Sequence, residues 1–443
     1  MDTVFNKFIQ GTQYVTIESA LKNELFHKVK YSEEINDNLM IKKFIPASGA
    51  ATRMFQSLYT YLDDEIETDF IKTYSKNLDK FSFYNTLALE GLPIKDAIKK
   101  VLDTYCHTPK ALIDIHKYNH LTVTPIEEHI NETLELNLDN TPELHFTISK
   151  EHEKLFKQKL KEIDTKDMDI TYSFQEPETD TLAVDMNNTP FLKDDGTPLY
   201  RPGGHGALIH NLNQLDADII MIKNIDNVCH HTFLQDTIDA KKTLLNTGLY
   251  VQKKIHQYIT DLLNGNYDLE NINQFLQGTL NITYKKDLTK AQALKFLDRP
   301  LRVCGVVKNQ GEPGGGPFIV DDGDYLSPQI VEMKEINLSN HQHIVAKAKY
   351  FNPVDLVCFV KDYQGNKYNL LDYLNDNRYF TSEKTYKGRP LKALEHPGLW
   401  NGAMHHWNTV FVEVPLTTFN PIKTVNDLLR EGHLGYKLEE EQK

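Results

Sequence analysis

The stretch Leu39–Met54, LMIKKFIPASGAATRM, decides the expected fold. Its first seven residues are rich in isoleucine and other apolar residues, which is typical of a buried strand. Small residues follow and lead into Thr-Arg-Met, so the segment predicts a strand that turns into a helix. Such a turn lets backbone N–H groups approach phosphate oxygens, while the helix end and a guanidinium add positive charge. Because Gly49 is its only glycine, a plain tight turn is the alternative.

Three further segments have the apolar content and the length of strands: Leu144–Ser149, Ile170–Phe174 and Ile219–Ile225. Helical patterns lie between them, interrupted in Tyr84–Tyr105 and continuous in Lys150–Ile163. Strands that alternate with helices predict an α/β fold, in which a mixed, mainly parallel sheet is flanked by helices. Ligands of such a fold bind at the carboxyl ends of the strands.

Composition excludes several classes of protein. With 443 residues and 40% hydrophobic residues, the chain is too long for a short binding module and can build a large core. The net charge of −13 argues against nucleic-acid partners, and no apolar run approaches the ~20 residues that span a bilayer. The N-terminus lacks a signal sequence, and the four cysteines are widely spaced, as expected for buried thiols in a reducing compartment. We therefore expect a cytoplasmic protein with small-molecule substrates and no membrane partner.

Three motifs carry candidate chemistry. RPGGHGALI, Arg201–Ile209, predicts a turn into a helix whose glycines let a nucleobase or ribose lie beside His205, although a surface turn is an equal alternative. Asp226 follows an expected strand, where a carboxylate either holds Mg²⁺ or caps the next turn. Pro109 fixes the chain before Lys110, whose ammonium either meets a phosphate or is solvated.

Later motifs are less specific. The run Gly314–Gly316 predicts close approach of a ligand or a mobile lid. It precedes QIVEMKEI, in which Glu332 points into a pocket or toward solvent. We expect Trp400 and Trp407 in the core. The histidine pairs and triplets lack the spacing of zinc ligands, and no G-x-S-x-G segment supports a serine hydrolase.

In this order, the motifs resemble those of the UDP-sugar pyrophosphorylase group of nucleotidyltransferases, and more closely those of a bacterial family of unknown function related to it. PASGAATRM, Pro46–Met54, is similar to the group's glycine-rich signature: Gly49, Thr52 and Arg53 match, while Ser48 and Ala51 replace glycines. PKAL, PGGHGAL, NIDN and QIVEMKEI resemble four further elements of the group. The resemblance covers roughly Leu39 to Asn337.

The resemblance implies a role for each matching residue. Arg53 and Lys110 are implied as the catalytic residues that hold phosphates, and Asp226 as the Mg²⁺ ligand. Asp355 of FNPVD, beyond the stretch that the resemblance covers, is expected as a second metal ligand. The implied nucleotide-binding residues are Ala47, Ser48, Gly49, Thr52, Gly204, His205 and Gly206. Gln175, which follows the third expected strand, is expected to contact the base. The implied sugar-binding residue is Glu332, and Gly315 and Asn401 are expected to bind the sugar beside it.

The resemblance also implies a GT-A-like fold, a domain division and a reaction. The expected domains are an N-terminal helical segment (1–38), a nucleotidyltransferase domain (39–345) and a smaller C-terminal α/β region (346–443). Arg53 and Lys110 are 57 positions apart, farther than in the group, which implies a helical insertion over about 56–107. The expected reaction joins an NTP, with UTP favoured, to a sugar 1-phosphate and releases pyrophosphate. A non-catalytic binding protein, suggested by Ser48 and Ala51, and a GT-A glycosyltransferase are the alternatives.

Overall fold

The computed structural model describes residues 2–27, 39–138, 140–312 and 314–438. Its contacts divide the chain into two units, each built from several segments. Unit 1 holds residues 1–41, 175–221 and 243–413, and unit 2 holds residues 42–174, 222–242 and 414–443. The contiguous division expected at 38/39 and 345/346 is a different partition of the chain and stays a prediction.

Unit 2 contains the parallel strands that the sequence predicts. β2 (Ile41–Pro46), β5 (Glu143–Ile148) and β6 (Ile170–Phe174) lie in this order and pair in parallel, with Phe44 opposite His145. Their apolar side chains share one core cluster with helices α6 (Pro125–Glu135) and α7 (Glu153–Glu162). The remaining strands of this region are β3 (His116–Tyr118), β4 (Leu121–Val123) and β9 (Ile219–Lys223), whose last residues belong to unit 2.

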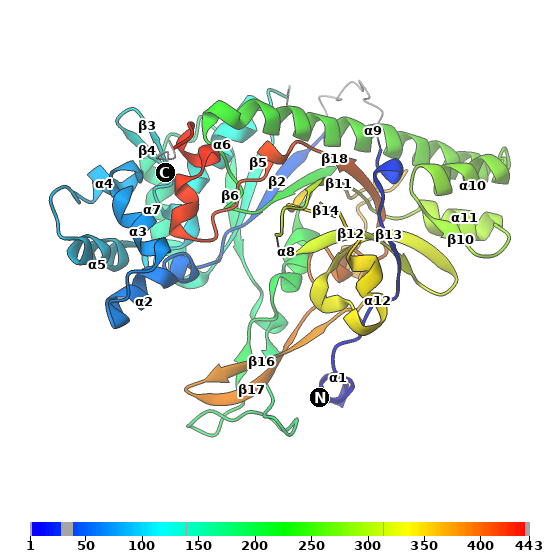
Figure 1. The fold of residues 1–443 in the computed structure, drawn as a ribbon. Helices are drawn as coiled ribbons and strands as arrows, with labels where there is room; N and C mark the ends of the chain where they lie inside the picture. Colours follow the sequence, from blue (N-terminus) through cyan, green and yellow to red (C-terminus); the bar gives the residue numbers. More distant parts are fainter. Residues whose placement is uncertain (1, 28–38, 139, 313, 439–443) are drawn as a thin grey trace. The chain divides into compact units, whose positions relative to one another are not determined.

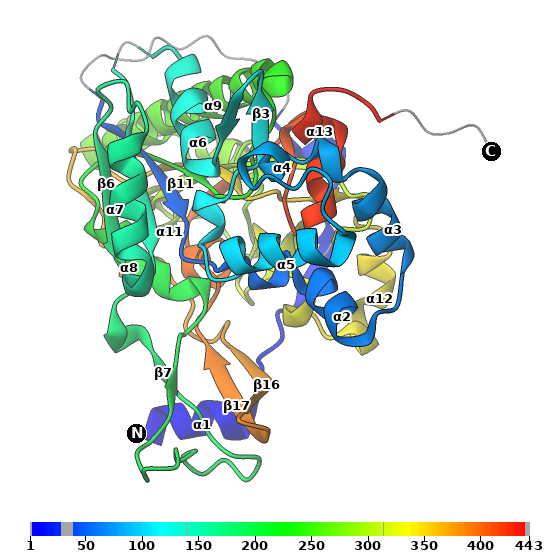
Figure 2. The ribbon, with the colours of Figure 1, turned by 90° about the vertical axis from the view of Figure 1, so that its left-hand side faces the viewer.

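The segment 56–107 of unit 2 is helical. It contains α2 (Gln56–Asp64), α3 (Asp69–Lys76), α4 (Phe83–Thr86) and α5 (Ile94–Tyr105), which gather in one group (Figure 2). A second core cluster fills this group with aromatic side chains, among them fully buried Phe55, Tyr74 and Phe83. The same cluster includes Ile422, Val425 and Leu428, so the segment from residue 414 onward, with α13 (Glu431–Leu434), packs into unit 2.

Unit 1 is built around the buried strand β11 (Leu301–Lys308). This strand is antiparallel to β14 (Tyr350–Phe351) and β15 (Asp355–Phe359) and parallel to β18 (Asn408–Glu413). The strand-like stretches DLVCFVKD and NTVFVEVPL, both rich in apolar and β-branched residues, form β15 and β18. Their pairing makes this part of the protein mixed in strand direction.

A second, antiparallel sheet in unit 1 has the order β1 (Ile17–Ala20), β12 (Gly315–Asp321), β13 (Tyr325–Glu332) and β10 (Thr283–Tyr284). β1 corrects the expectation of a purely helical N-terminal segment, because alternating Val15 and Ile17 are buried against this sheet after α1 (Asp2–Gln10) ends. Residues 28–38 of that segment lie outside the described part. The unit also contains helices α8 (Leu208–Gln214), α9 (Leu234–Asn264, which begins in unit 2), α10 (Leu269–Gly278), α11 (Lys290–Leu297) and α12 (Leu338–Val345). Of these, α10 and α11 lie side by side (Figure 1).

The segment Glu176–Arg201, rich in Asp, Thr, Pro and Asn, is a long loop that contains the short 3₁₀ helix Pro177–Thr179 and the two-residue strands β7 (Thr181–Leu182) and β8 (Tyr200–Arg201). β7 lies beside the hairpin of β16 (Phe380–Tyr386) and β17 (Arg389–Glu395) in Figure 2, and the backbones of Val184 and Lys392 exchange hydrogen bonds of 2.8 and 3.0 Å. In the described part of the chain, no helix combines the length and apolar character needed to cross a membrane. All four cysteines are free and buried, as expected.

Candidate functional site

The loop Pro46–Arg53 follows β2 in unit 2 and is held by backbone contacts. Ala51 N–H donates to the carbonyl of Thr108 at 3.3 Å, and Lys110 N–H donates to the carbonyl of Gly49 at 3.1 Å. The residues 48–50, Thr52 and Arg53 are exposed, whereas Ala47 is buried in the core of the sheet and Ala51 in the helical core cluster. The two segments that the resemblance assigns to phosphates are therefore adjacent, as their proposed roles require.

Gly49 leaves room beside this loop. Its φ lies outside the left-handed region, and an added Cβ would meet no heavy atom within 4 Å. Ser48 and Ala51 also avoid positive φ, so their replacement of glycines does not strain the backbone. Within the described residues, the N–H groups of Ser48 and Gly49 have no acceptor. Two exposed donors beside open space make this loop suitable for an anionic oxygen.

Lys110 and Asp226, which the resemblance assigns to a phosphate and to Mg²⁺, contact each other in unit 2. Lys110 Nζ lies 2.9 Å from Asp226 Oδ2 and donates to the carbonyl of Ile422 at 2.7 Å. Both charged side chains are about one-fifth exposed, so solvent and ligands reach them. Arg53, at the end of the short turn Ala51–Arg53, is exposed and forms no ion pair with any described residue. The guanidinium is therefore free to bind an anion.

Sequence reasoning missed the segment Pro421–Thr424. Ile422 N–H donates to the carbonyl of Asp226 at 3.2 Å, and its own carbonyl accepts from Lys110. The exposed Lys423 follows directly and adds a cation to this part of unit 2. A signal was present in the sequence, since Thr424 and Asp427 form a capping box just after the lysine.

Glu332, Asn401 and His205 meet in unit 1. Asn401 Nδ2 donates to Glu332 Oε1 at 2.7 Å, and His205 Nε2 lies 3.6 Å from the same oxygen. The N–H of Leu399 donates to His205 Nδ1 at 3.1 Å, which places the ring proton on Nε2, facing the carboxylate. Gly315 lies directly opposite Glu332 in the β12–β13 pairing. The three expected sugar-binding residues are thus brought together with His205.

The carboxyl of Glu332 is ionised throughout the physiological range. Burial would raise its pKa, but the hydrogen bond from His205, the charge of Lys334 and the Asn401 amide lower the pKa to about 2. Lys334 Nζ lies 3.3 Å from Glu332 Oε2. Asn401 Oδ1 is buried and has no hydrogen-bond partner among the described residues. An ionised carboxylate beside an unsatisfied amide oxygen favours a ligand that donates hydrogen bonds, such as a hydroxyl-rich sugar.

A buried ion pair supports the backbone that carries Glu332. Glu335 Oε2 accepts from the N–H of Glu332 at 2.8 Å, and Glu335 Oε1 lies 2.7–2.8 Å from the guanidinium of Arg378. Arg378 also donates to the carbonyl of Ile330 at 3.0 Å. Because Arg378 and Glu335 are almost fully buried, this network fixes the end of β13 and the direction of Glu332.

The glycines near His205 have mainly a packing role. A Cβ on Gly206 would lie 2.1 Å from the carbonyl oxygen of Pro397, so this loop and the segment from Pro397 to Trp400 approach too closely for a side chain. Gly204 has φ +78°, which glycine adopts without strain. Trp400 is partly exposed and stacks on His205 with ring centroids 4.3 Å apart, which corrects its expected core position. Trp407 is buried, as expected.

Two expected site residues do not join these clusters within their units. Gln175 donates to Thr179 Oγ1 at 3.3 Å and turns toward its own loop. Asp355 is the first residue of β15 in unit 1 and is 1% exposed, whereas Asp226 belongs to unit 2. Their roles in base and metal binding stay predictions.

Asp226 fits a magnesium ion that is held mainly by substrate. One oxygen of its carboxylate contacts Lys110, and the side chain is 22% exposed, so its other oxygen is available as a hard ligand. Mg²⁺ prefers oxygen ligands and usually keeps several waters beside one or two carboxylates and substrate phosphates. Across the described ranges, no group of three or more His, Cys, Asp or Glu side chains could form a closed metal site. A single accessible carboxylate agrees with that pattern.

The fold resembles solved structures of sugar-nucleotide pyrophosphorylases. A variant of UDP-glucose pyrophosphorylase from Leishmania major in complex with UDP-glucose has a TM-score of 0.50 and 12% identity, covering 96% of this chain and 73% of that chain. A UDP-glucose phosphorylase from Trypanosoma brucei has a TM-score of 0.49 and 14% identity, covering 97% and 73%. A uridine diphosphate N-acetylglucosamine pyrophosphorylase from Trypanosoma brucei has a TM-score of 0.43 and 11% identity, covering 88% and 64%.

The likeness to the Leishmania major enzyme shows a shared α/β fold and confirms the expected resemblance at that level. No curated protein sequence matches this chain. From residue 10 to residue 434 it matches the family described as Domain of unknown function (DUF4301), and the chain therefore belongs to that family.

Proposed function

We propose that this protein is a nucleotidyltransferase with a GT-A type arrangement, which joins an NTP, UTP in the first instance, to a sugar 1-phosphate and releases pyrophosphate. The loop at Gly49 carries the proposal: it presents two N–H donors without acceptors, open space and the exposed Arg53, and it is hydrogen-bonded to the segment that bears Lys110. These features suit a polyphosphate. The pyrophosphorylase-like fold supports the same reaction class.

The reaction needs positioning and charge neutralisation more than proton transfer. A phosphate oxygen of the sugar 1-phosphate attacks the α-phosphorus of the NTP, and the bond from that phosphorus to the bridging oxygen breaks as pyrophosphate leaves. The attacking oxygen is already anionic, so no general base is required. Arg53 binds the departing phosphates, and Lys110, oriented by Asp226, holds the α-phosphate or the acceptor phosphate. Mg²⁺ held by Asp226 would supply further neutralisation of phosphate charge.

Unit 1 supplies the sugar and nucleoside contacts in this proposal. Glu332 accepts hydrogen bonds from sugar hydroxyls, since its low pKa keeps it ionised. Asn401 adds its buried amide oxygen, and Gly315 leaves the adjacent backbone without a side chain. The remaining nucleoside contacts are assigned to Gln175, Gly204, His205 and Gly206.

The first test is a pyrophosphate-release assay that crosses the common NTPs with a panel of sugar 1-phosphates in the presence of Mg²⁺. Arg53→Ala should lower turnover about 100-fold or more, because one preorganised cation at the leaving group is lost. Lys99→Ala, which removes another exposed cation of unit 2, is the matched control and should be fully active. Acceptor-dependent release that is equal in all three proteins would refute the assignment of Arg53.

A non-catalytic nucleotide-binding protein is the second candidate. Two observations favour it: the charge of Lys110 is already balanced by Asp226, and the N–H of Ala51 is already bonded to Thr108. This candidate predicts saturable UTP binding in calorimetry, without exchange of labelled pyrophosphate into UTP when a nucleotide sugar is supplied. Exchange above background excludes it. A GT-A glycosyltransferase would instead consume nucleotide sugars independently of pyrophosphate.

A further inference from the structure

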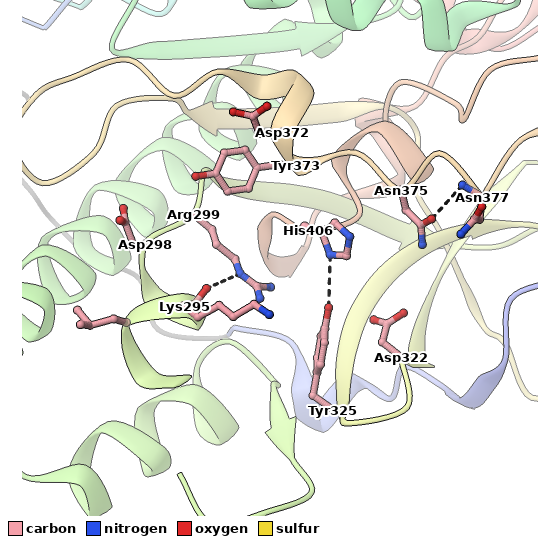
Figure 3. A pocket seen from close by; sticks show the side chains of 11 residues that line it. Lys295, Asp298, Arg299, Asp322, Tyr325, Asp372, Tyr373, Asn375, Asn377 and His406 are labelled. Carbon is pink, nitrogen blue, oxygen red and sulfur yellow. Dashed lines mark hydrogen bonds between the residues drawn. The ribbon is translucent and has the colours of Figure 1, made fainter. Parts of the chain in front are cut away.

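Unit 1 contains a polar cavity of about 760 Å³ that has no part in the proposed reaction (Figure 3). Its walls come from the end of α11 and the residues that follow it, the turn between β12 and β13, the segment 372–377 and His406. The volume is typical of a site for a small organic molecule. Apart from Leu294, the lining side chains are charged, amide, imidazole or phenol groups, so an apolar ligand is a poor match.

Arg299 is the most unusual group in this wall. Its side chain lines the cavity although the residue is only 8% exposed. Nε donates to the carbonyl of Lys295 at 2.7 Å, and the guanidinium lies over the rings of Phe296 and Tyr325, at 5.0 and 5.7 Å from their centroids. Among the described residues, Arg299 forms no ion pair with a carboxylate. Tyr325 and Asp322 attract the guanidinium, but no described carboxylate forms an ion pair with it, so an anion in the cavity would gain a direct contact with a buried cation.

Three carboxylates line the cavity, but none of them is within ion-pair distance of Arg299, and protein groups already bind two of them. Asp298 accepts from the Tyr368 hydroxyl at 2.7 Å. Asp322 lies 2.9 Å from His405 Nε2 and accepts from Ser327 Oγ at 3.3 Å. The third, Asp372, is exposed at the rim.

Lys295 adds a second positive charge to the same wall, and no described carboxylate forms an ion pair with it. In Figure 3 the Lys295 side chain runs beside the Arg299 guanidinium, and both extend toward Tyr325 and His406. His406 is neutral at pH 7, since burial, and then the neighbouring His405, lower its pKa to about 4. Arginine and lysine side by side form a pair of donors for a phosphate or carboxylate group.

The rest of the cavity offers groups that both donate and accept hydrogen bonds. Asn375, Asn377 and Tyr373 line the side formed by segment 372–377, with the Asp372 carboxylate as an additional acceptor. Hydroxyl groups of a sugar also donate and accept, and the tyrosine rings provide flat faces for its C–H surface. We infer that this cavity binds a sugar-class molecule that carries one anionic group, with the anion on Arg299 and Lys295 and the hydroxyls on segment 372–377.

Calorimetric titration of the full chain tests this inference with glucose 6-phosphate and glucuronate, two sugars that carry a phosphate and a carboxylate. Saturable binding of either is expected, and their relative affinities show which anion the site prefers. Glucose and inorganic phosphate should each bind at least about tenfold more weakly, because each makes only half of the contacts. Absence of binding by both anionic sugars overturns the inference.

Variants locate the binding. Lys295→Gln, at an exposed position, should weaken binding about tenfold without affecting folding, and Arg299→Gln should weaken it further. Lys290→Gln on the same helix lies outside the cavity wall and is the matched control. Lys295→Gln is expected to fold, so it tests the site alone if Arg299→Gln does not fold. Binding that is unchanged in Lys295→Gln but lost in Glu332→Gln would place the ligand in the other cluster of unit 1 and refute the inference.

Discussion

Glu132 is expected to be the most sensitive buried charge of unit 2. Its Oε1 lies 3.0 Å from Lys43 Nζ on β2, and its Oε2 lies 2.6 Å from Lys223 Nζ on β9. The three side chains are at most 3% exposed. β2 leads into the loop at Gly49, and β9 leads to Asp226, so one carboxylate on α6 supports both elements that the proposed reaction uses. We predict that Glu132→Gln destabilises unit 2 and disorders both.

The distances give the size of the effect. At an effective dielectric constant of about 20, the two contacts are worth roughly 5.5 and 6.4 kcal/mol of Coulomb attraction before desolvation is subtracted. Measurements on buried ion pairs show that loss of one partner costs about 3–5 kcal/mol, because the other charge stays buried and unpaired. Glutamine keeps the volume of glutamate, so packing contributes little. We expect a loss of about 3–5 kcal/mol in the free energy of unfolding at pH 6.

The pH dependence has a defined sign. The pKa of Glu132 is held well below its usual value of 4.5, because the attraction of Lys223 and Lys43 outweighs the effect of burial. Its contribution to stability is therefore complete above pH 4.5 and is lost as the pH falls through the folded-state pKa. Burial lowers the pKa of Lys43 to about 8, so above pH 8 this partner is neutral in the wild type as well. The loss in the free energy of unfolding caused by Glu132→Gln, relative to the wild type, should be largest near pH 6 and smaller at pH 3 and pH 9.

Hydrogen exchange measures unit 2 separately from unit 1. Both tryptophans belong to unit 1, so their fluorescence follows that unit, whereas exchange of peptides from β2 and α6 follows unit 2. Glu135→Gln removes an exposed carboxylate from the same helix and is the control. Lys43→Met added to Glu132→Gln should recover part of the loss, since one fewer lysine is left unpaired. If Glu132→Gln lowers the free energy of unfolding at pH 6 by less than about 1 kcal/mol, or by no more than Glu135→Gln does, the reasoning is refuted.

Three further predictions concern the two clusters of candidate site residues. Gly49→Ala should keep or slightly raise the melting temperature in thermal melts, because the φ of this residue suits alanine and the added methyl group meets no atom. The same variant should weaken UTP binding about tenfold in calorimetry. Glu332→Gln should raise the KM for the sugar 1-phosphate about tenfold with little change in the KM for the NTP in steady-state kinetics. The folded-state pKa of Glu332, about 2, lies below the usual 4.5, so its contribution to stability is complete above pH 4.5 and is lost between pH 4.5 and 2. Acid unfolding followed by tryptophan fluorescence should accordingly be less steep in Glu332→Gln.

The strands β2, β5 and β9 are predictable from sequence because they are largely buried. β9, IIMIK, is buried along its whole length, and such a strand shows as a dense apolar run. β12 was not predicted as a strand, since it begins with Gly315, Gly316 and Pro317, which are unfavourable in strands. Pairing with β13 supplies the stability that the local sequence lacks.

In the candidate site, too, contacts between residues far apart in the sequence could not be predicted from local patterns. The motif order singled out Lys110 and Asp226 separately, one for a phosphate and one for Mg²⁺, but their direct contact was not predicted. The carbonyl of Ile422, 312 positions from Lys110, could not be anticipated, since no local pattern indicates which distant backbone will return. Gly206 pointed to a ligand in the sequence, but its neighbour is the backbone of Pro397, which only the folded chain brings close.

The discontinuity of unit 2 also has a consequence for synthesis on the ribosome. The helical core around Phe55 and Phe83 includes side chains from the 414–438 segment, and Lys110 bonds to the carbonyl of Ile422. About 240 residues separate residue 174 from residue 414. At roughly 5–20 residues per second, the ribosome needs about 12–50 s to make them. During that time the apolar side chains of the early helices lack part of their packing partners. Unit 2 is therefore expected to depend on chaperones until Ile422, Val425 and Leu428 emerge from the ribosome.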